Sequence, residues 1–288
     1  MLWAMLHRLG MIAALVWLPG LAVAQAQQGV SAWDEGAHAG ARLIAGAMLK
    51  SEVVPHLRAG LEIHLEPGWK TYWRYPGDSG VPPTLDFTDS ENVTAVTVLW
   101  PAPQRFADGA GGNSIGYHGD IILPLRITAK DAAKPSSLRV RLSYVVCGKL
   151  CVPAEADLNV VLSGAASGQE SALVAAEARV PRHVPLGSGS GLAIRSVHRE
   201  RGDGPDRVVV EVAAPRDAPV DLFVEGPAAT WALPVPEPID ATSSGAPGVR
   251  RFAFELDGLP PGASVEGATL TFTAVSRDEA IEVAAHLD

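Results

Sequence analysis

The stretch 138–162, LRVRLSYVVCGKLCVPAEADLNVVL, holds both cysteines of the chain and alternates apolar and polar residues on either side of them. A period of two with one apolar face is the pattern of a half-buried β-strand. Between the two runs lie Gly148, Lys149 and Leu150, and a loop of this length with a glycine is common in hairpins. The sequence therefore predicts a long antiparallel hairpin with the cysteines at its turn.

Cys147 and Cys151 both fall on the polar side of this alternation. We therefore expect both sulfurs to lie outside the core and to be accessible. The short loop places the two residues opposite each other with Cβ atoms about 4.5–5.5 Å apart, so a somewhat strained disulfide is feasible. A crosslink over so few residues restricts the unfolded chain little, which favours a redox-active bond over a structural staple. The staple and a metal site stay open, although two thiolates without a nearby third ligand are a weak metal site.

The first 26 residues are typical of a secretory signal peptide. Arg8 precedes the apolar run MIAALVWLPGLAVA, and two overlapping small-x-small sites predict cleavage near Ala24 or Ala26. No later segment approaches the ~18 consecutive apolar residues of a membrane span, so we expect no transmembrane segment in the mature chain. Export allows a disulfide to form. The net charge of −9, without a basic stripe, argues against a nucleic-acid partner.

Strand patterns recur on both sides of a middle segment of flexible composition. They cover residues 56–65, 93–100 and 121–127 in the first half and 192–197, 207–212, 220–224, 251–256, 268–275 and 281–285 in the second. The 29 glycines and 23 prolines supply the turns that many short strands require. Three segments are less clear: a short amphipathic piece at Ala41–Leu49, a turn-rich aromatic segment at Glu66–Phe87, and a long glycine-rich loop at 101–120.

These patterns predict an all-β fold of two tandem immunoglobulin-like antiparallel β-sandwiches after a signal peptide. The predicted divisions are the signal peptide at 1–26, a redox domain at 27–165, a linker at 166–190 and a second sandwich at 191–288. Within the linker, ESALVAAEAR is expected to form one or two helical turns. The second sandwich has no cysteine and no evident catalytic constellation.

Two other features of the first half carry weaker predictions. Ser114 lacks the setting of a nucleophile elbow, so its neighbours His118 and Asp120 do not indicate a hydrolytic triad. An aromatic run mixed with two basic residues either packs at a sheet edge or stacks on a sugar ring or a peptide. Its members are Trp69, Lys70, Tyr72, Trp73, Arg74 and Tyr75.

Three segments together resemble the N-terminal periplasmic domain of the disulfide reductase DsbD family, particularly its ScsB-like branch. They are PGWKTYWRYPGDSG, GYHGDIILPLRI and YVVCGKLCVPAEADL, within residues 50–165. The resemblance implies an immunoglobulin-like periplasmic domain whose cysteine pair alternates between dithiol and disulfide without a cofactor or metal. It also implies two kinds of partner, a membrane-embedded thiol electron donor and periplasmic thioredoxin-like acceptors.

Residue by residue, Cys147 and Cys151 match the redox pair of that family, and Trp69 and Tyr72 fit its aromatic segment near the site. Three further near-site candidates are Tyr144, Lys149 and Glu155. Lys149 would favour a thiolate, whereas the carboxylate of Glu155 would disfavour it or assist proton transfer.

The chain also departs from the family pattern. DsbD has five residues between its cysteines, whereas this chain has three. The region that aligns with its aromatic cap loop, Asp108–Ile115, contains no aromatic residue. The membrane conduit and the thioredoxin-like domain of DsbD are expected to be separate proteins.

Two alternative functions remain open from the sequence. A non-catalytic binding or assembly module with a structural disulfide predicts a bond that resists mild reductants. A copper-handling protein using the same thiols predicts stoichiometric Cu(I) binding, because thiolates are soft ligands. The sequence does not indicate which cysteine attacks first.

Overall fold

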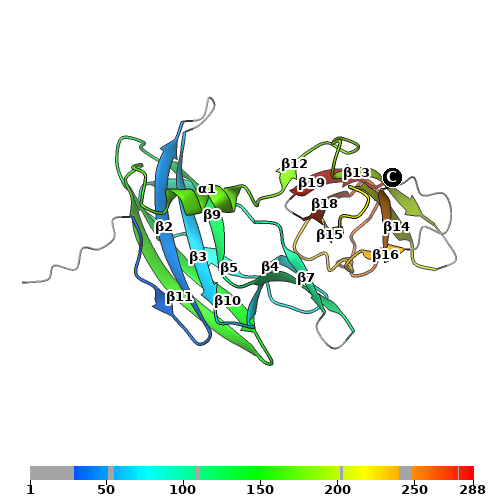
Figure 1. Ribbon diagram of the computed structural model, residues 1–288, viewed down its shortest axis with the longest axis horizontal. Coiled ribbons are helices and arrows are strands. Elements are labelled where there is room, and N and C mark those ends of the chain that lie inside the picture. The colour runs from blue at the N-terminus through cyan, green and yellow to red at the C-terminus, as the bar shows by residue number, and fades with distance from the viewer. Residues whose placement is uncertain (1–28, 51–54, 108–110, 202–203, 240–247, 278) are drawn as a thin grey trace, which may run out of the picture.

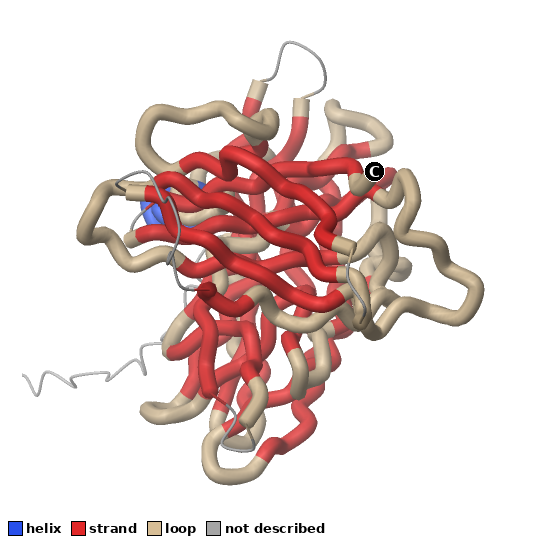
Figure 2. The backbone as a smooth tube through the Cα atoms, turned by 90° about the vertical axis from the view of Figure 1, so that its right-hand side faces the viewer, coloured by secondary structure: helices blue, strands red, loops and turns tan. Residues whose placement is uncertain are grey.

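A computed structural model describes residues 29–50, 55–107, 111–201, 204–239, 248–277 and 279–288, and the regular structure of this part is almost all strand (Figures 1 and 2). The predicted signal peptide lies outside the described residues. Within them, no helix combines the length and the apolar character needed to cross a membrane.

The first sandwich consists of two sheets whose inner faces share one apolar core. One sheet has the strand order β1-β2-β3-β9-β6, and the other has the order β11-β10-β4-β8-β7 with β5 paired to β10. The strands are β1 (Asp34–Glu35), β2 (Ala39–Leu49), β3 (His56–Leu65), β4 (Lys70–Gly77), β5 (Thr84–Asp86), β6 (Val93–Val98), β7 (Gln104–Ala107), β8 (Asn113–His118), β9 (Ile121–Ala129), β10 (Ser136–Cys147) and β11 (Cys151–Leu162).

The predicted cysteine hairpin is present as β10 and β11. Its residues pair without a break from Ser136↔Leu162 to Cys147↔Cys151. Leu138 and Val140 are buried, whereas Arg139 between them is exposed, as the alternation requires. The apolar face of the hairpin therefore builds the core, and the cysteines lie at its far end.

Strand β2 corrects the prediction of a short amphipathic piece at Ala41–Leu49. Residues Ala39–Leu49 form one long strand that is buried over most of its length. Its alternation is absent because the outer face is covered as well: Leu173 packs directly onto the backbone of Gly46 in β2 and Gly60 in β3. A strand covered on both faces reads as continuously apolar rather than as alternating.

Strands β4, β7 and β8 correct the predictions of a turn-rich segment and a long loop. The pairing of β4 with β8 shifts register between Tyr72 and Gly77, so the residues between them bulge out of the ladder. A bulge interrupts the period of two on which the sequence prediction depends. Strand β8 lies within the predicted loop at 101–120 and pairs with both β4 and β7.

Helix α1 (Glu170–Glu177) supplies the helical turns predicted after the hairpin and packs against the first sandwich. Leu173 is fully buried there. Arg58 of β3 bonds to Glu177 at 2.9 Å and also to Glu170. The first part of the predicted linker is therefore attached to the first sandwich.

The second sandwich has its own apolar core between two four-stranded sheets. Their orders are β12-β19-β18-β15 and β13-β14-β17-β16, and every pairing described here is antiparallel except β12 with β19. The strands are β12 (Arg182–His183), β13 (Ala193–Glu200), β14 (Arg207–Ala213), β15 (Asp221–Glu225), β16 (Glu237–Ile239), β17 (Val249–Glu255), β18 (Thr269–Ser276) and β19 (Glu279–His286). The predicted all-β fold of two tandem sandwiches is confirmed.

Candidate functional site

The two cysteines form a disulfide at the turn of the β10–β11 hairpin. Cys147 and Cys151 are directly paired across the ladder, with Cα atoms 4.1 Å apart and an S–S bond of 2.06 Å. The connection of Gly148, Lys149 and Leu150 is closed by a 3.0 Å hydrogen bond from the Gly148 amide to the Leu150 carbonyl. The hairpin thus brings the sulfurs together through backbone pairing alone.

The two sulfurs differ in exposure, which corrects the prediction that both are accessible. Cys147 is only 2% exposed, whereas Cys151 is exposed. Cys147 lies inside the sheet because β4 pairs with the end of β10, placing Lys70 opposite Cys147. Cys151 begins β11, which forms the edge of the sheet. A partner approaching from solvent therefore meets Cys151.

Tyr72 of β4 contacts both sulfurs. Its hydroxyl lies 3.0 Å from the Sγ of Cys147 and 3.7 Å from the Sγ of Cys151. Disulfide sulfurs have no proton to give, so the hydroxyl donates. The ring is buried and packs against Gly80, where an added Cβ would lie 2.6 Å from the ring. This donor is placed to stabilise a negative charge on Cys147 when the bond opens.

Trp69 covers the turn between the cysteines. A Cβ added at Gly148 would lie 3.1 Å from its ring. His38 stacks on the indole, with ring centroids 3.8 Å apart and an angle of 11°. The Nδ1 of His118 lies 3.1 Å from the Trp69 carbonyl oxygen, which accepts from the Nδ1–H tautomer. Trp69 is therefore held at the loop by contacts of both its ring and its backbone.

Lys70, which was not predicted as a site residue, lies opposite Cys147 in the ladder and contacts two further side chains. Lys70 donates a 2.8 Å hydrogen bond to Ser114, and its amine lies 5.3 Å from the centre of the Phe106 ring. Phe106 meets His118 edge-on, with centroids 4.4 Å apart. The alternation of Ile115 and Tyr117 with polar or small residues is the sequence signal that would have identified β8. Phe106 adds an aromatic residue before the predicted unshielded loop, of which residues 108–110 lie outside the described part.

The other predicted site residues are Lys149, Tyr144 and Glu155, and no described contact joins them to the sulfurs. Lys149 is exposed in the loop. Tyr144 is buried on the opposite, core-facing side of β10, and burial, with Asp34 and Glu35 nearby, raises its pKa to about 12. Glu155 is exposed and pairs with Ser143. It lies four residues beyond Cys151, a distance of about 13 Å along a strand.

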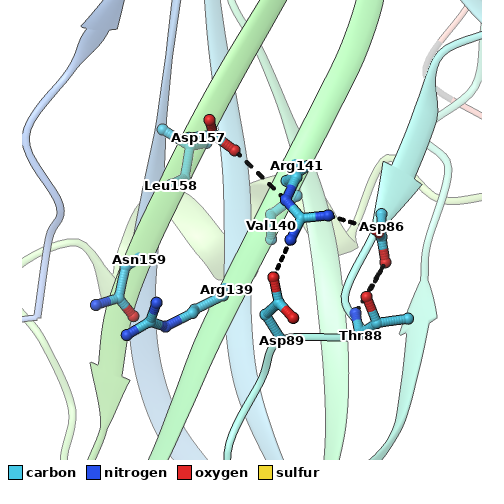
Figure 3. Close-up of a pocket in the computed structure, with 9 residues that line it drawn as sticks. All are labelled: Asp86, Thr88, Asp89, Arg139, Val140, Arg141, Asp157, Leu158 and Asn159. Carbon is cyan, nitrogen blue, oxygen red and sulfur yellow. Dashed lines mark hydrogen bonds and ion pairs between the residues drawn. The ribbon is translucent and has the colours of Figure 1, made fainter.

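Figure 3 shows a polar pocket of about 350 Å³ on the outer face of the hairpin. Arg141 points between three carboxylates there, those of Asp86, Asp89 and Asp157. Hydrogen bonds from Thr88 lower the pKa of Asp86, and Arg141 adds to the effect. The Arg141↔Asp157 pair is six ladder positions from the cysteines, which is about 20 Å along the strands. The pocket is therefore separate from the disulfide.

Within the described residues, no three histidine, cysteine, aspartate or glutamate side chains are grouped as a metal site requires.

Residues 48–163 match the family model of the N-terminal domain of the thiol:disulfide interchange protein DsbD. This part of the chain is therefore similar to a DsbD N-terminal domain. The predicted resemblance, placed at residues 50–165, is confirmed. The family match, together with the Cys147–Cys151 disulfide, supports a general role in thiol–disulfide exchange.

A solved structure shares the arrangement of both sandwiches. The crystal structure of the N-terminal periplasmic domain of ScsB from Proteus mirabilis superposes with a TM-score of 0.68 at 22% sequence identity. The match covers 90% of this chain and 98% of that chain, so the DsbD-type domain and the second sandwich occur together in that fold. A comparison with curated proteins finds no match.

Proposed function

We propose that the chain is a periplasmic protein that passes reducing equivalents through Cys147 and Cys151. A membrane-embedded thiol protein is the proposed electron donor, and periplasmic thioredoxin-like proteins are the proposed acceptors. The observation that carries the proposal is the asymmetry of the pair: Cys151 is exposed, and Cys147 is buried with the Tyr72 hydroxyl 3.0 Å from its sulfur. A nucleophile at the surface and a shielded resolving residue are what thiol exchange needs.

In the charging half-reaction, a donor thiolate attacks the Sγ of Cys151 and the Cys147–Cys151 bond breaks. Cys147 leaves as a thiolate, which accepts the Tyr72 hydrogen bond and lies opposite the cationic Lys70 in the ladder. A second donor thiolate then attacks the donor sulfur of the mixed disulfide, and Cys151 leaves. The donor is oxidised by two electrons, and the pair takes up those electrons and two protons.

In the delivery half-reaction, the Cys151 thiolate attacks the disulfide of the acceptor. One acceptor sulfur leaves as a thiolate and takes a proton. Cys147 then attacks Cys151, re-forms the Cys147–Cys151 bond and releases the reduced acceptor. Burial of Cys147 keeps other oxidants away from the resolving thiol, while its ladder position opposite Cys151 makes resolution intramolecular.

Export and processing are part of the same proposal. The charged N-terminal region, the apolar run and the small-x-small sites support removal of the signal peptide near Ala24 or Ala26. The periplasm is a compartment in which the disulfide can be maintained.

The two single cysteine variants test which sulfur attacks. Each reduced variant is mixed with a thioredoxin-fold protein that retains one cysteine, activated as its thionitrobenzoate disulfide, and the coloured leaving group is followed. Cys147→Ala, which retains the exposed Cys151, is expected to form the mixed disulfide at least about tenfold faster than Cys151→Ala. Equal slow rates in both variants, together with unfolding of the wild type when its disulfide is reduced, would identify a structural bond instead.

A further inference from the structure

The segment of β4 next to Tyr72 reaches into the second sandwich. After Tyr72 the strand leaves its ladder with β8 and rejoins it at Gly77. Within this bulge Trp73 is fully buried, and its ring lies 5.9 Å from that of Phe223 in β15. Figure 1 shows β4 and β7 on the side of the first sandwich that faces the second. The residue that contacts the sulfurs is therefore adjacent in sequence to one that packs on the other domain.

Arg74 and Tyr75 extend this contact. The guanidinium of Arg74 makes two bonds to the Glu225 carboxylate, of 2.9 Å from Nε and 2.7 Å from Nη2, and a further one to Glu282. The Tyr75 hydroxyl donates to the carbonyl of Leu233. All of these partners belong to the second sandwich or its loops.

Arg105 makes an equivalent contact from β7. It bonds to Asp221 at 3.0 Å, to Glu237 at 2.8 Å and to the carbonyl of Pro236 at 2.8 Å. The next residue, Phe106, points to the other face of the strand, where it meets Lys70 and His118. As at Tyr72, a residue of the redox site adjoins one that is bound to the second sandwich.

The contacts of Arg74 and Arg105 fix the position of the first sandwich relative to the second, in addition to burying surface. The side chains of Arg74 and Arg105 are 26% and 16% exposed, and their bonds to carboxylates are charge-assisted and directional. Beside the Arg74–Glu225 contact the two domains leave a cavity of about 620 Å³, lined by Tyr75, Gly80 and Trp231 among others. The geometry of the junction therefore depends strongly on the two arginines.

We propose that the second sandwich fixes the positions of Tyr72 and Phe106 beside the cysteine pair, with Arg74 and Arg105 as the positioning residues. The proposal rests on the redox function proposed above and assigns a role to the second domain. Loss of the junction would let the β4 bulge and β7 move, and the Tyr72 hydroxyl would no longer be held at Cys147.

The test reverses two charges in the second sandwich and leaves the DsbD-type domain unchanged in sequence except at one cysteine. Asp221→Lys/Glu225→Lys places cations opposite Arg105 and Arg74. The matched control, Asp206→Lys, opposes Arg199, which has two acidic partners inside the second sandwich. All variants are made in a Cys151→Ala background, so that Cys147 is the only thiol, and its thiolate is followed by ultraviolet absorbance against pH.

The junction variant is expected to lower the Cys147 thiolate fraction at pH 7 by at least about threefold, since part of a hydrogen bond to a charged group is lost. The control is expected to keep the unaltered profile. An unchanged profile in the folded junction variant overturns the proposal. If that variant does not fold, Glu225→Gln, which removes only the charge that pairs with Arg74, is judged by the same rule. Reduction of the wild-type disulfide by dithiothreitol is measured alongside: resistance to it contradicts the redox function, whereas an unchanged profile with a reducible bond contradicts only the positioning role.

Discussion

At the scale of single residues, the two cysteines share a strand face but not an environment. The alternation of the hairpin places both on its polar side, and that placement could be predicted from the sequence. The burial of Cys147 could not, because it depends on Tyr72, which lies 75 residues away in the chain. For the same reason the sequence offered Lys149 as the thiolate-stabilising cation, whereas ladder register places Lys70 opposite Cys147.

Tyr72→Phe is expected to retain the buried ring and lose the hydrogen bond to Cys147. Because a hydrogen bond to a charged group contributes about 1.5–3 kcal/mol, the thiolate fraction of Cys147 at pH 7 should fall about tenfold or more. Absorbance of the thiolate in a Cys151→Ala background measures this. Tyr144→Phe, which alters a tyrosine on the core side of β10, is the control, and an equal effect in both variants would exclude a specific role for Tyr72.

At the scale of elements, the alternation of apolar and polar residues predicted a strand correctly where one face of that strand is buried. It did not do so where both faces are covered or where the strand bulges. The β10–β11 hairpin follows the predicted register, because apolar core-facing residues alternate with mostly polar residues on its outer face. Strand β2 lacks alternation since helix α1 covers its outer side, and β4 loses it at the bulge after Tyr72. Both exceptions arise from contacts with distant parts of the chain, which a local pattern does not contain.

Gly116 is expected to be required for the pairing of β4 with β8. A Cβ added there would lie 2.0 Å from the carbonyl oxygen of Thr71, so Gly116→Ala forces the two backbones apart. We expect a loss of about 1–3 kcal/mol in the free energy of unfolding, measured by urea denaturation. Gly168→Ala, at an exposed position with no atom within 4 Å of the added Cβ, should change it by less than about 0.5 kcal/mol. Equal urea midpoints for the two variants would contradict the close approach.

At the scale of the whole molecule, the presence of two sandwiches could be predicted, but their junction could not. The aromatic and basic run from Trp69 to Tyr75 was noted with two open explanations, packing or ligand stacking. In the structure Trp73 and Tyr75 pack, and Arg74 pairs with Glu225, which is 151 residues away. A charged residue in a sequence does not indicate its partner at such a separation.

The junction is expected to weaken between pH 10 and pH 12. Burial, with Asp78 and Glu225 nearby, raises the pKa of Tyr75 to about 12 from its ordinary value of 10.0. The folded state therefore holds this proton more tightly than the unfolded state, and the stability it contributes is complete below pH 10 and is lost as the pH rises toward 12.

Urea midpoints of the wild type at pH 8 and pH 11 should show this loss, and Tyr75→Phe should show a smaller one. Tyr117 and Tyr144 also have raised pKa values, so the variant keeps part of the dependence. The same fall in the variant and the wild type would contradict the assignment to Tyr75.

The reduction potential of the Cys147–Cys151 pair tests the central claim most directly. The protein is equilibrated with glutathione buffers of graded composition, and the oxidised fraction is read by thiol alkylation and mass. An exchange protein should have a potential above about −300 mV and remain folded in both states. A potential well below about −300 mV, with unfolding of the DsbD-type domain on reduction, would show that the bond is a structural staple.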